Sequence, residues 1–137
     1  MKAIIVGCGR LGSLVAISLQ ERGYEVCVID RDGDAFLRLG KDFSGETMVG
    51  SGLDETVLQS AGIREADIFM ALTGNDNYNI MSAQIAKACF SVPRSIARVD
   101  DPIKAGIFKE VGIETICLTS IGLNLILEMI SAGSMTP

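Results

Sequence analysis

Three glycines near the start of the sequence have the spacing of a phosphate-binding loop. Gly7, Gly9 and Gly12 form a GxGxxG motif that follows an apolar run and precedes a stretch with helical periodicity. In a strand–turn–helix unit, the first glycine permits the tight turn and the second lets a pyrophosphate approach the backbone. The third lets the helix pack closely on the sheet, and the helix N-terminus presents unpaired N–H groups to the phosphates. The motif predicts a nucleotide site; the alternative is a glycine turn that binds nothing.

An acidic residue follows the second apolar run at the spacing typical of ribose recognition. Asp30 comes directly after the run 26–29, 18 residues beyond Gly12. A carboxylate at this place binds ribose hydroxyls, which favours NAD or an adenosine nucleotide over NADP. Arg31 weakens that preference slightly, because a guanidinium could instead meet a 2′-phosphate.

Small and polar residues end the next two expected strands. Ser51 and Gly52 follow the third strand and could admit an adenine or a ribose. The fourth ends in the segment 73–76, Thr-Gly-Asn-Asp, which forms either part of the binding cleft or simply a turn and helix cap. Asn79 lies one helical turn after Asn75 and could point at the same cleft. Because ligands of doubly wound sheets bind beyond the carboxyl ends of the strands, these residues are expected to lie together.

Arg98 lies near the carboxyl end of the fifth expected strand. A charge inside a strand must either pair or meet a ligand, because burying an isolated charge is very unfavourable. Its partner is expected to be a phosphate or the acidic pair 100–101, and the phosphate is the favoured interpretation.

The composition excludes several classes of function. The chain has no His, which rules out His-based triads, metal sites and acid–base pairs. The formal net charge of -5 argues against a sequence-independent grip on nucleic acid, and the absence of Trp, with few aromatics, argues against stacking on single strands. No metal site is expected. Hydride transfer usually needs a positioned acid or base, and no Lys, Tyr or carboxylate stands out by position, so an enzyme is not expected.

The four cysteines predict a reducing, cytosolic compartment, since they form no CxxC pair or disulfide framework. Cys27, Cys89 and Cys117 lie in apolar runs and are expected to be small buried hydrophobes. Cys8 is expected to fill space inside the glycine loop. The alternative is a redox role, with its pKa lowered by the helix N-terminus and Arg10.

The whole chain alternates short apolar runs with helical patterns, which predicts an α/β fold: a doubly wound, Rossmann-like parallel sheet of about six strands with helices on both faces. The expected strands are 3–6, 26–29, 47–49, 67–72, 94–99 and 114–118. The expected helices are 11–19, 35–41, 54–61, 75–89, 102–111 and a last one from about 120 that Gly133 and Ser134 stop. Residues 1–118 are predicted to form the nucleotide-binding domain and 119–137 a C-terminal dimerisation or crossover helix, with no separate second domain.

The last helix is more apolar than one domain requires. Its apolar residues cover an arc of about 240°, whereas a helix packed on one sheet needs only about 100°. We therefore expect residues 120–131 to pack against a second copy of the chain; the alternative is a helix tucked into its own domain with a few exposed leucines. The apolar stretch 116–130 contains Asn124 and Glu128 and is too short to span a membrane. The N-terminal run is likewise too short for a signal peptide.

The sequence resembles the RCK N-terminal domain family, also called TrkA N-terminal, of nucleotide-binding regulators of potassium channels and transporters. The matching stretches are 6–12, 28–30, 58–63, 66–67, 75–80, 97–99 and 101–102. The resemblance implies a cytoplasmic, non-enzymatic subunit, peripheral on the inner face of the membrane, that gates a membrane potassium-transport partner on binding NAD(H) or ATP/ADP. It implies a homo-oligomer, either a dimer or a ring of dimers. Many members carry a second, C-terminal ligand-binding domain, which implies that a partner supplies that function here.

By position in the family's motifs, the glycine loop with Arg10 would hold phosphates, Asp30 the ribose, and Arg98 would face phosphate. Ser51, Gly52, Thr73 and Gly74 would line the adenosine side. The family often has an acid at the position of Ser51, so no acidic role is assigned there. The rival interpretation is the cofactor-binding part of an NAD-dependent oxidoreductase. The full set of expected cofactor-binding residues is Gly7, Cys8, Gly9, Arg10, Leu11, Gly12, Asp30, Arg31, Ser51, Gly52, Thr73, Gly74, Asn79 and Arg98.

Overall fold

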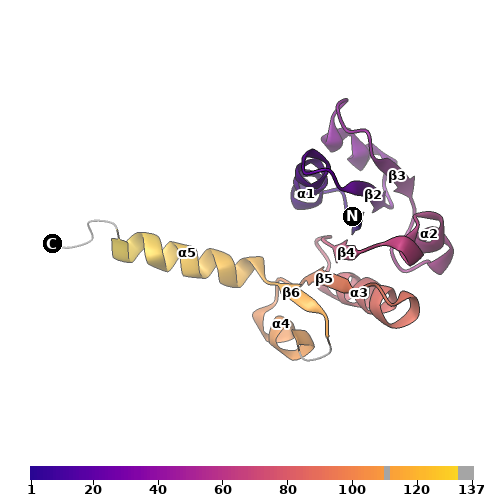
Figure 1. Ribbon diagram of the computed structural model, residues 1–137. Helices are drawn as coiled ribbons and strands as arrows, with labels where there is room; N and C mark the ends of the chain where they lie inside the picture. Colours follow the sequence, from indigo (N-terminus) through magenta and orange to yellow (C-terminus); the bar gives the residue numbers. More distant parts are fainter. Residues whose placement is uncertain (110–111, 133–137) are drawn as a thin grey trace.

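Strands and helices alternate along the chain in the computed structural model, which describes residues 1–109 and 112–132 (Figure 1). The strands are β1 (Lys2–Val6), β2 (Glu25–Asp30), β3 (Glu46–Val49), β4 (Ile68–Ala71), β5 (Arg94–Arg98) and β6 (Glu114–Ile116). The α-helices are α1 (Arg10–Glu21), α2 (Glu55–Ser60), α3 (Asp76–Phe90), α4 (Pro102–Phe108) and α5 (Leu118–Ala132). Two 3-10 helices, η1 (Gly33–Leu39) and η2 (Ile63–Glu65), complete the described elements.

All six strands are parallel and lie in the order β3-β2-β1-β4-β5-β6. Val6 at the end of β1 pairs with Ile29 on one side and with Ala71 on the other. The chain therefore reverses its direction of travel across the sheet between β1 and β4, and this is where ligands of such sheets bind. The predicted doubly wound, Rossmann-like fold is confirmed.

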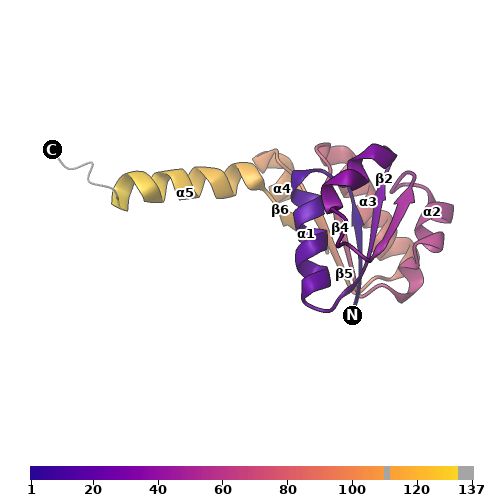
Figure 2. The same ribbon diagram turned by 90° about the horizontal axis from the view of Figure 1, so that it is seen from above.

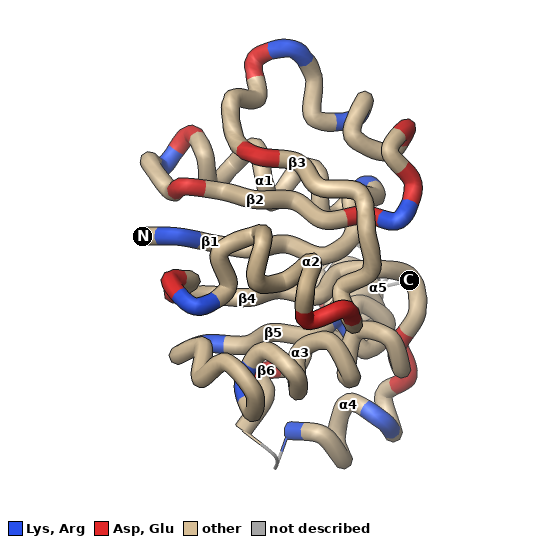
Figure 3. Tube along the Cα trace, turned by 90° about the vertical axis from the view of Figure 1, so that its right-hand side faces the viewer, with Lys and Arg blue, Asp and Glu red and all other residues tan. Residues whose placement is uncertain are grey.

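The sheet is buried on both faces because successive residues of a strand point to opposite sides. Ile4 and Val6 pack with Leu58 and Phe69 into a core beneath α2, α3 and α4. Ala3 and Ile5 point the other way, into a second core beneath α1 and η1. In Figure 1, α1 accordingly lies on one side of the sheet, and α2 and α3 lie on the other. Figure 3 shows Lys, Arg, Asp and Glu distributed along the chain, with the two signs interspersed.

Two expected helices differ from the structure in their type or their first residue. The segment expected as a helix at 35–41 is a 3-10 helix that begins at Gly33, where the Asp32 carboxylate accepts a hydrogen bond from the N–H of Asp34. The last helix begins at Leu118 instead of residue 120, because the N–H of Ile121 already bonds the carbonyl of Cys117. The expected helix end at 110–111 and the expected stop at 133–134 lie outside the described residues.

Helix α5 projects away from the sheet and its covering helices (Figure 2). None of its residues is buried, and seven large apolar side chains are exposed on it: Ile121, Leu123, Leu125, Ile126, Leu127, Met129 and Ile130. The alternative of a helix tucked into its own domain is therefore wrong for this structure. No helix among the described residues is long and apolar enough to cross a membrane.

Candidate functional site

The glycine loop joins β1 to α1 and is held by backbone geometry at both ends. Gly7 has a φ of +104°, which L side chains rarely adopt, and its N–H donates to the carbonyl of Ile29 at 2.8 Å. A Cβ on Gly12 would overlap the carbonyl oxygen of Gly7. Gly9 differs, because a Cβ built there would meet no atom within 4 Å. Gly7 and Gly12 are therefore required by the fold, whereas the space at Gly9 is left open.

The N-terminus of α1 is left free of the side-chain caps that close the other helices of the sheet. Its N-cap is Gly9, which has no side chain to cap it, and its first turn contains no acid. By contrast, Asp54, Asn75 and Asp101 each accept a backbone N–H at the start of α2, α3 and α4. The first helical bond of α1 runs from the N–H of Ser13 to the carbonyl of Gly9. The earlier N–H groups of that turn have no partner within the helix and suit an anion.

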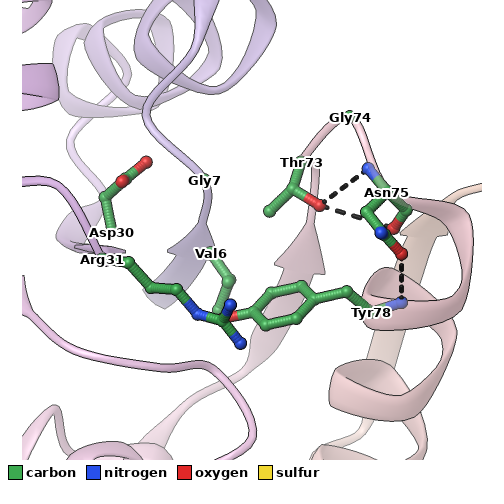
Figure 4. Close-up of a pocket in the computed structure, with 8 residues that line it drawn as sticks. All are labelled: Val6, Gly7, Asp30, Arg31, Thr73, Gly74, Asn75 and Tyr78. Carbon is green, nitrogen blue, oxygen red and sulfur yellow. Dashed lines mark hydrogen bonds between the residues drawn. The ribbon is translucent and has the colours of Figure 1, made fainter.

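A cleft of about 340 Å³ opens at the carboxyl ends of the strands, between β2 and the start of α3 (Figure 4). Its position between β1 and β4 matches the place where the strand order reverses. The size falls within the range of pockets that hold small molecules, roughly 300–1,000 Å³. Eight residues line it: Val6, Gly7, Asp30, Arg31, Thr73, Gly74, Asn75 and Tyr78. Five of the predicted residues, Gly7, Asp30, Arg31, Thr73 and Gly74, are therefore brought together.

Asp30 ties the end of β2 to the glycine loop. One carboxylate oxygen accepts the N–H of Cys8 at 2.8 Å, and the other accepts the N–H of Asp32 at 2.8 Å. Each oxygen has a second lone pair, so the carboxylate keeps the capacity to accept hydroxyl donors from a ligand in the cleft.

Arg31 and Tyr78 face each other at the cleft. The Arg31 guanidinium lies over the Tyr78 ring, 4.6 Å from its centre (Figure 4). One of its amino groups lies 3.5 Å from the hydroxyl oxygen of Ser51. The Tyr78 hydroxyl accepts the N–H of Gly52 at 2.6 Å. Arg31 thus joins the β2 end to α3. The sequence interpretation missed Tyr78 as a lining residue, although it lies inside the stretch 75–80 that carried the family resemblance.

Ser51 and Gly52 contact Arg31 and Tyr78, respectively, but do not line the cleft. A Cβ on Gly52 would come within 2.6 Å of the Val6 side chain and 2.8 Å of the hydroxyl of Ser82. The glycine therefore lets the β3–α2 connection pack directly on the end of β1. Arg10 is exposed at the first position of α1, and Leu11 packs against the second core.

Asn79 does not line the cleft, contrary to expectation, but it supports a residue that does. It is fully buried, and its amide group donates to the carbonyls of Thr73 and Arg98, both at 2.8 Å. Its oxygen accepts the N–H and the hydroxyl of Thr73. The buried Asn79 side chain therefore stabilises the turn that follows β4.

Arg98 has the second of its two expected partners. Its guanidinium binds the Asp100 carboxylate with two nitrogens, at 2.9 Å in the shorter contact, and it does not line the cleft. Both side chains are only partly buried. The phosphate favoured by sequence reasoning is not needed to neutralise this arginine, because a neighbour two residues away does so.

The cysteine expectations hold in part. Cys8 is buried, and burial and the nearby Asp30 carboxylate raise its pKa, whereas the redox alternative required a lowered one. Cys27 is buried as expected, and burial raises its pKa to about 11. Cys117 is half-buried, but Cys89 is exposed, because it lies on the outer side of α3 near its C-terminus. Within the described residues, no three His, Cys, Asp or Glu side chains are grouped as metal ligands.

Comparison with known protein families finds one whose model matches most of the chain. The family description "TrkA-N domain" matches residues 3–119. The chain belongs to the TrkA-N domain family. A Trk system potassium uptake protein TrkA of Streptomyces coelicolor is 43% identical over 116 residues, which are 85% of this chain and 52% of that protein. A TrkA homologue of Pyrococcus abyssi is 39% identical over 111 residues, 81% of this chain and 49% of that protein. This TrkA-N chain thus spans about half the length of these relatives.

Solved structures share the fold of this TrkA-N chain. The TrkA-N domain of the Escherichia coli inner membrane protein ybaL superposes with a TM-score of 0.84 at 21% identity, covering 94% of this chain and 96% of that one. The structure of GsuK bound to ADP superposes with a TM-score of 0.79 at 22% identity, covering 94% of this chain and 33% of that one. The GsuK channel bound to NAD superposes with a TM-score of 0.73 at 21% identity, covering 88% of this chain and 22% of that one.

Proposed function

We propose that this TrkA-N domain is a nucleotide-binding regulatory module of a potassium uptake system or channel. The observation that carries the proposal is the open N-terminus of α1, which meets the cleft at the glycine loop with Asp30 beside it. NAD(H) and ATP/ADP are the ligands that fit, because both combine phosphates with a ribose that keeps its 2′-hydroxyl. The curated relatives are named as potassium uptake proteins, and GsuK has been solved with NAD and with ADP.

The chain's residues would divide the ligand between them. The free N–H groups at the start of α1 donate to the phosphates, and Gly9 lets them approach. Asp30 accepts from the ribose hydroxyls while its bonds to Cys8 and Asp32 hold it in place. Thr73 and Gly74 bound the opposite side of the cleft. Binding, not catalysis, is the role these groups support.

Regulation requires that the nucleotides bind two conformations of the module with different affinities. The module would act at the cytoplasmic face of the membrane, on a membrane subunit that conducts potassium. Helix α5 is the element that reaches furthest from the cleft-bearing domain (Figure 2), and it is where a mechanical connection is expected.

The same helix would hold two copies of the chain together. On the side of the sheet that carries α1, the side chains of Ile68 in β4 and Ile96 in β5 are only partly buried. An apolar helix from a second copy would cover exposed surface of this kind, and the exposed leucines and isoleucines of α5 provide one.

Replacing Leu125 with glutamate is expected to weaken this dimer at least tenfold, because a charge replaces a leucine whose burial in the dimer would contribute about 1.5–3 kcal/mol in each copy. Asn124→Glu is the matched control on the polar side of the same helix and is expected to leave association unchanged. Sedimentation velocity over a range of concentrations measures both. Equal association of the Leu125→Glu variant and the parent chain would count against an α5-mediated dimer.

Titration of the purified chain with NAD, NADH, ATP and ADP tests the sensing role directly. At least one of them is expected to bind with a dissociation constant below about 1 mM, as measured by calorimetry. If none binds in that range, the sensing role is lost. Steady NADH oxidation with a panel of keto acids would instead favour the oxidoreductase interpretation.

A further inference from the structure

The carboxylate of Asp76 connects the helix that borders the cleft to the loop at the base of α5. Asp76 is the first residue of α3, between Asn75 and Tyr78, which line the cleft, but it does not line the cleft itself. One of its oxygens accepts the N–H of Asp100 at 2.8 Å, and the other accepts the N–H of Asp101 at 3.0 Å. Both carboxylate oxygens thus bind the loop that contains Asp100 and Asp101, which lie 24 and 25 residues further along the chain.

The loop that Asp76 holds also contacts the start of α5. The carbonyl of Asp100 accepts the Cys117 thiol at 3.4 Å, and the N–H of Val99 donates to the carbonyl of Ile116 at 2.9 Å. The carbonyl of Cys117 in turn accepts the first helical bond of α5, from Ile121. Three successive contacts therefore lead from the N-terminus of α3 to the N-terminus of α5.

The charge on Asp76 is maintained by these same contacts. Partial burial acts to raise its pKa, but the two backbone N–H donors, with Lys104 and Arg98 nearby, outweigh burial, and the pKa lies below its usual value. At neutral pH, Asp76 is therefore an anion that binds two N–H groups, and bonds of this charge-assisted kind are stronger than bonds between neutral groups.

We propose that Asp76 is a positioning residue that couples the nucleotide cleft to α5. A ligand that shifts the start of α3 through Asn75 or Tyr78 would move the carboxylate, and the carboxylate would carry residues 100–101 and the adjoining Cys117 with it. The inference rests on the proposed function, since it needs a ligand in the cleft, and it adds the route by which occupancy reaches the helix. The neighbouring Asp101 has a local task, because its side chain caps α4 through the N–H of Ile103.

Hydrogen–deuterium exchange on the full chain, with and without about 1 mM NAD or ADP, tests this coupling. In the parent chain, nucleotide is expected to change exchange both at the cleft and at residues 117–121. Asp76→Ala and Asp76→Asn are expected to bind the nucleotide as the parent does, while the change at 117–121 falls about fivefold or more. Without nucleotide, the amides of residues 100 and 101 are expected to exchange faster in Asp76→Ala, because they lose their acceptors.

Asp54→Asn is the matched control. Asp54 also lies at a helix start, but its carboxylate bonds only the N–H of Thr56 within its own helix. This variant is expected to keep the response at 117–121. If the Asp76 variants bind nucleotide and keep that response in full, Asp76 does not couple the two places and the proposed function stands. If the parent chain binds no nucleotide, the proposed function itself fails and the coupling falls with it.

Discussion

Replacing Gly9 with valine is expected to weaken nucleotide binding strongly and leave the fold intact. A Cβ at this position would meet no atom within 4 Å, so the domain is expected to tolerate the larger side chain. It would occupy the space through which phosphates reach the free N–H groups at the start of α1. Hydrogen bonds to charged groups contribute about 1.5–3 kcal/mol each, so the loss of two weakens binding by about 100-fold or more. Calorimetric titration with NAD and ADP measures the loss.

Two further glycines make this result specific. Gly106→Val, in α4, also adds a valine where a Cβ meets no atom within 4 Å, and it is expected to bind nucleotide as the parent chain does. Gly12→Val is expected to lose stability as well as binding, because its Cβ would overlap the Gly7 carbonyl. Thermal unfolding of all three variants separates the two effects. Unchanged affinity in Gly9→Val would mean that phosphates do not bind at the glycine loop.

Replacing Asn79 with alanine is expected to lower the free energy of unfolding by about 3 kcal/mol or more. The change leaves the Thr73 N–H and the carbonyls of Thr73 and Arg98 without their partner, and each buried unsatisfied group costs about 1–3 kcal/mol. Domains are stable by only about 5–15 kcal/mol in total, so this variant approaches the limit of folding. Urea denaturation of the parent and the variant measures the difference.

Asn77→Ala is the control for Asn79, on the same helix but exposed, where a change within about 0.5 kcal/mol is expected. Asn79→Asp is a second probe. It keeps the acceptor for Thr73 but loses the donor to both carbonyls and places a charge in the core, so it too is expected to be strongly destabilised. A loss below about 1 kcal/mol in Asn79→Ala would show that the turn after β4 does not depend on this amide.

Local pattern was sufficient to predict the scaffold of the site. Gly7, Asp30, Thr73 and Gly74 were all expected at the cleft, and the structure lines it with them. Their place at the cleft could be predicted because each lies at a strand end or just after one, and such positions can be found from the order of apolar runs and glycines. Their roles toward a ligand stay predictions. A parallel sheet then brings the carboxyl ends of its strands to one edge without further information.

Predictions from local sequence patterns were wrong where the direction of a side chain depends on its packing or on a partner brought to it by the fold. Asn79 was expected to face a ligand, but its amide reaches the carbonyl of Arg98, 19 residues away. Arg98 was expected to face phosphate, but the turn after β5 brings Asp100 back against it. Cys89 lies in an apolar run and was expected to be buried, but the turn of α3 places it outside.

The order of strands and helices, the glycine loop and the excess of apolar residues in the last helix can all be found without a structure, because they depend on spacing along the chain. Which residues face the cleft depends on the folded domain. It set Tyr78 against Arg31, turned Asn79 inward and left α5 without a covering partner in its own domain. The order of strands along the chain places the residues that follow them at one edge of the sheet. The direction of each side chain depends instead on packing between segments that are far apart in the sequence.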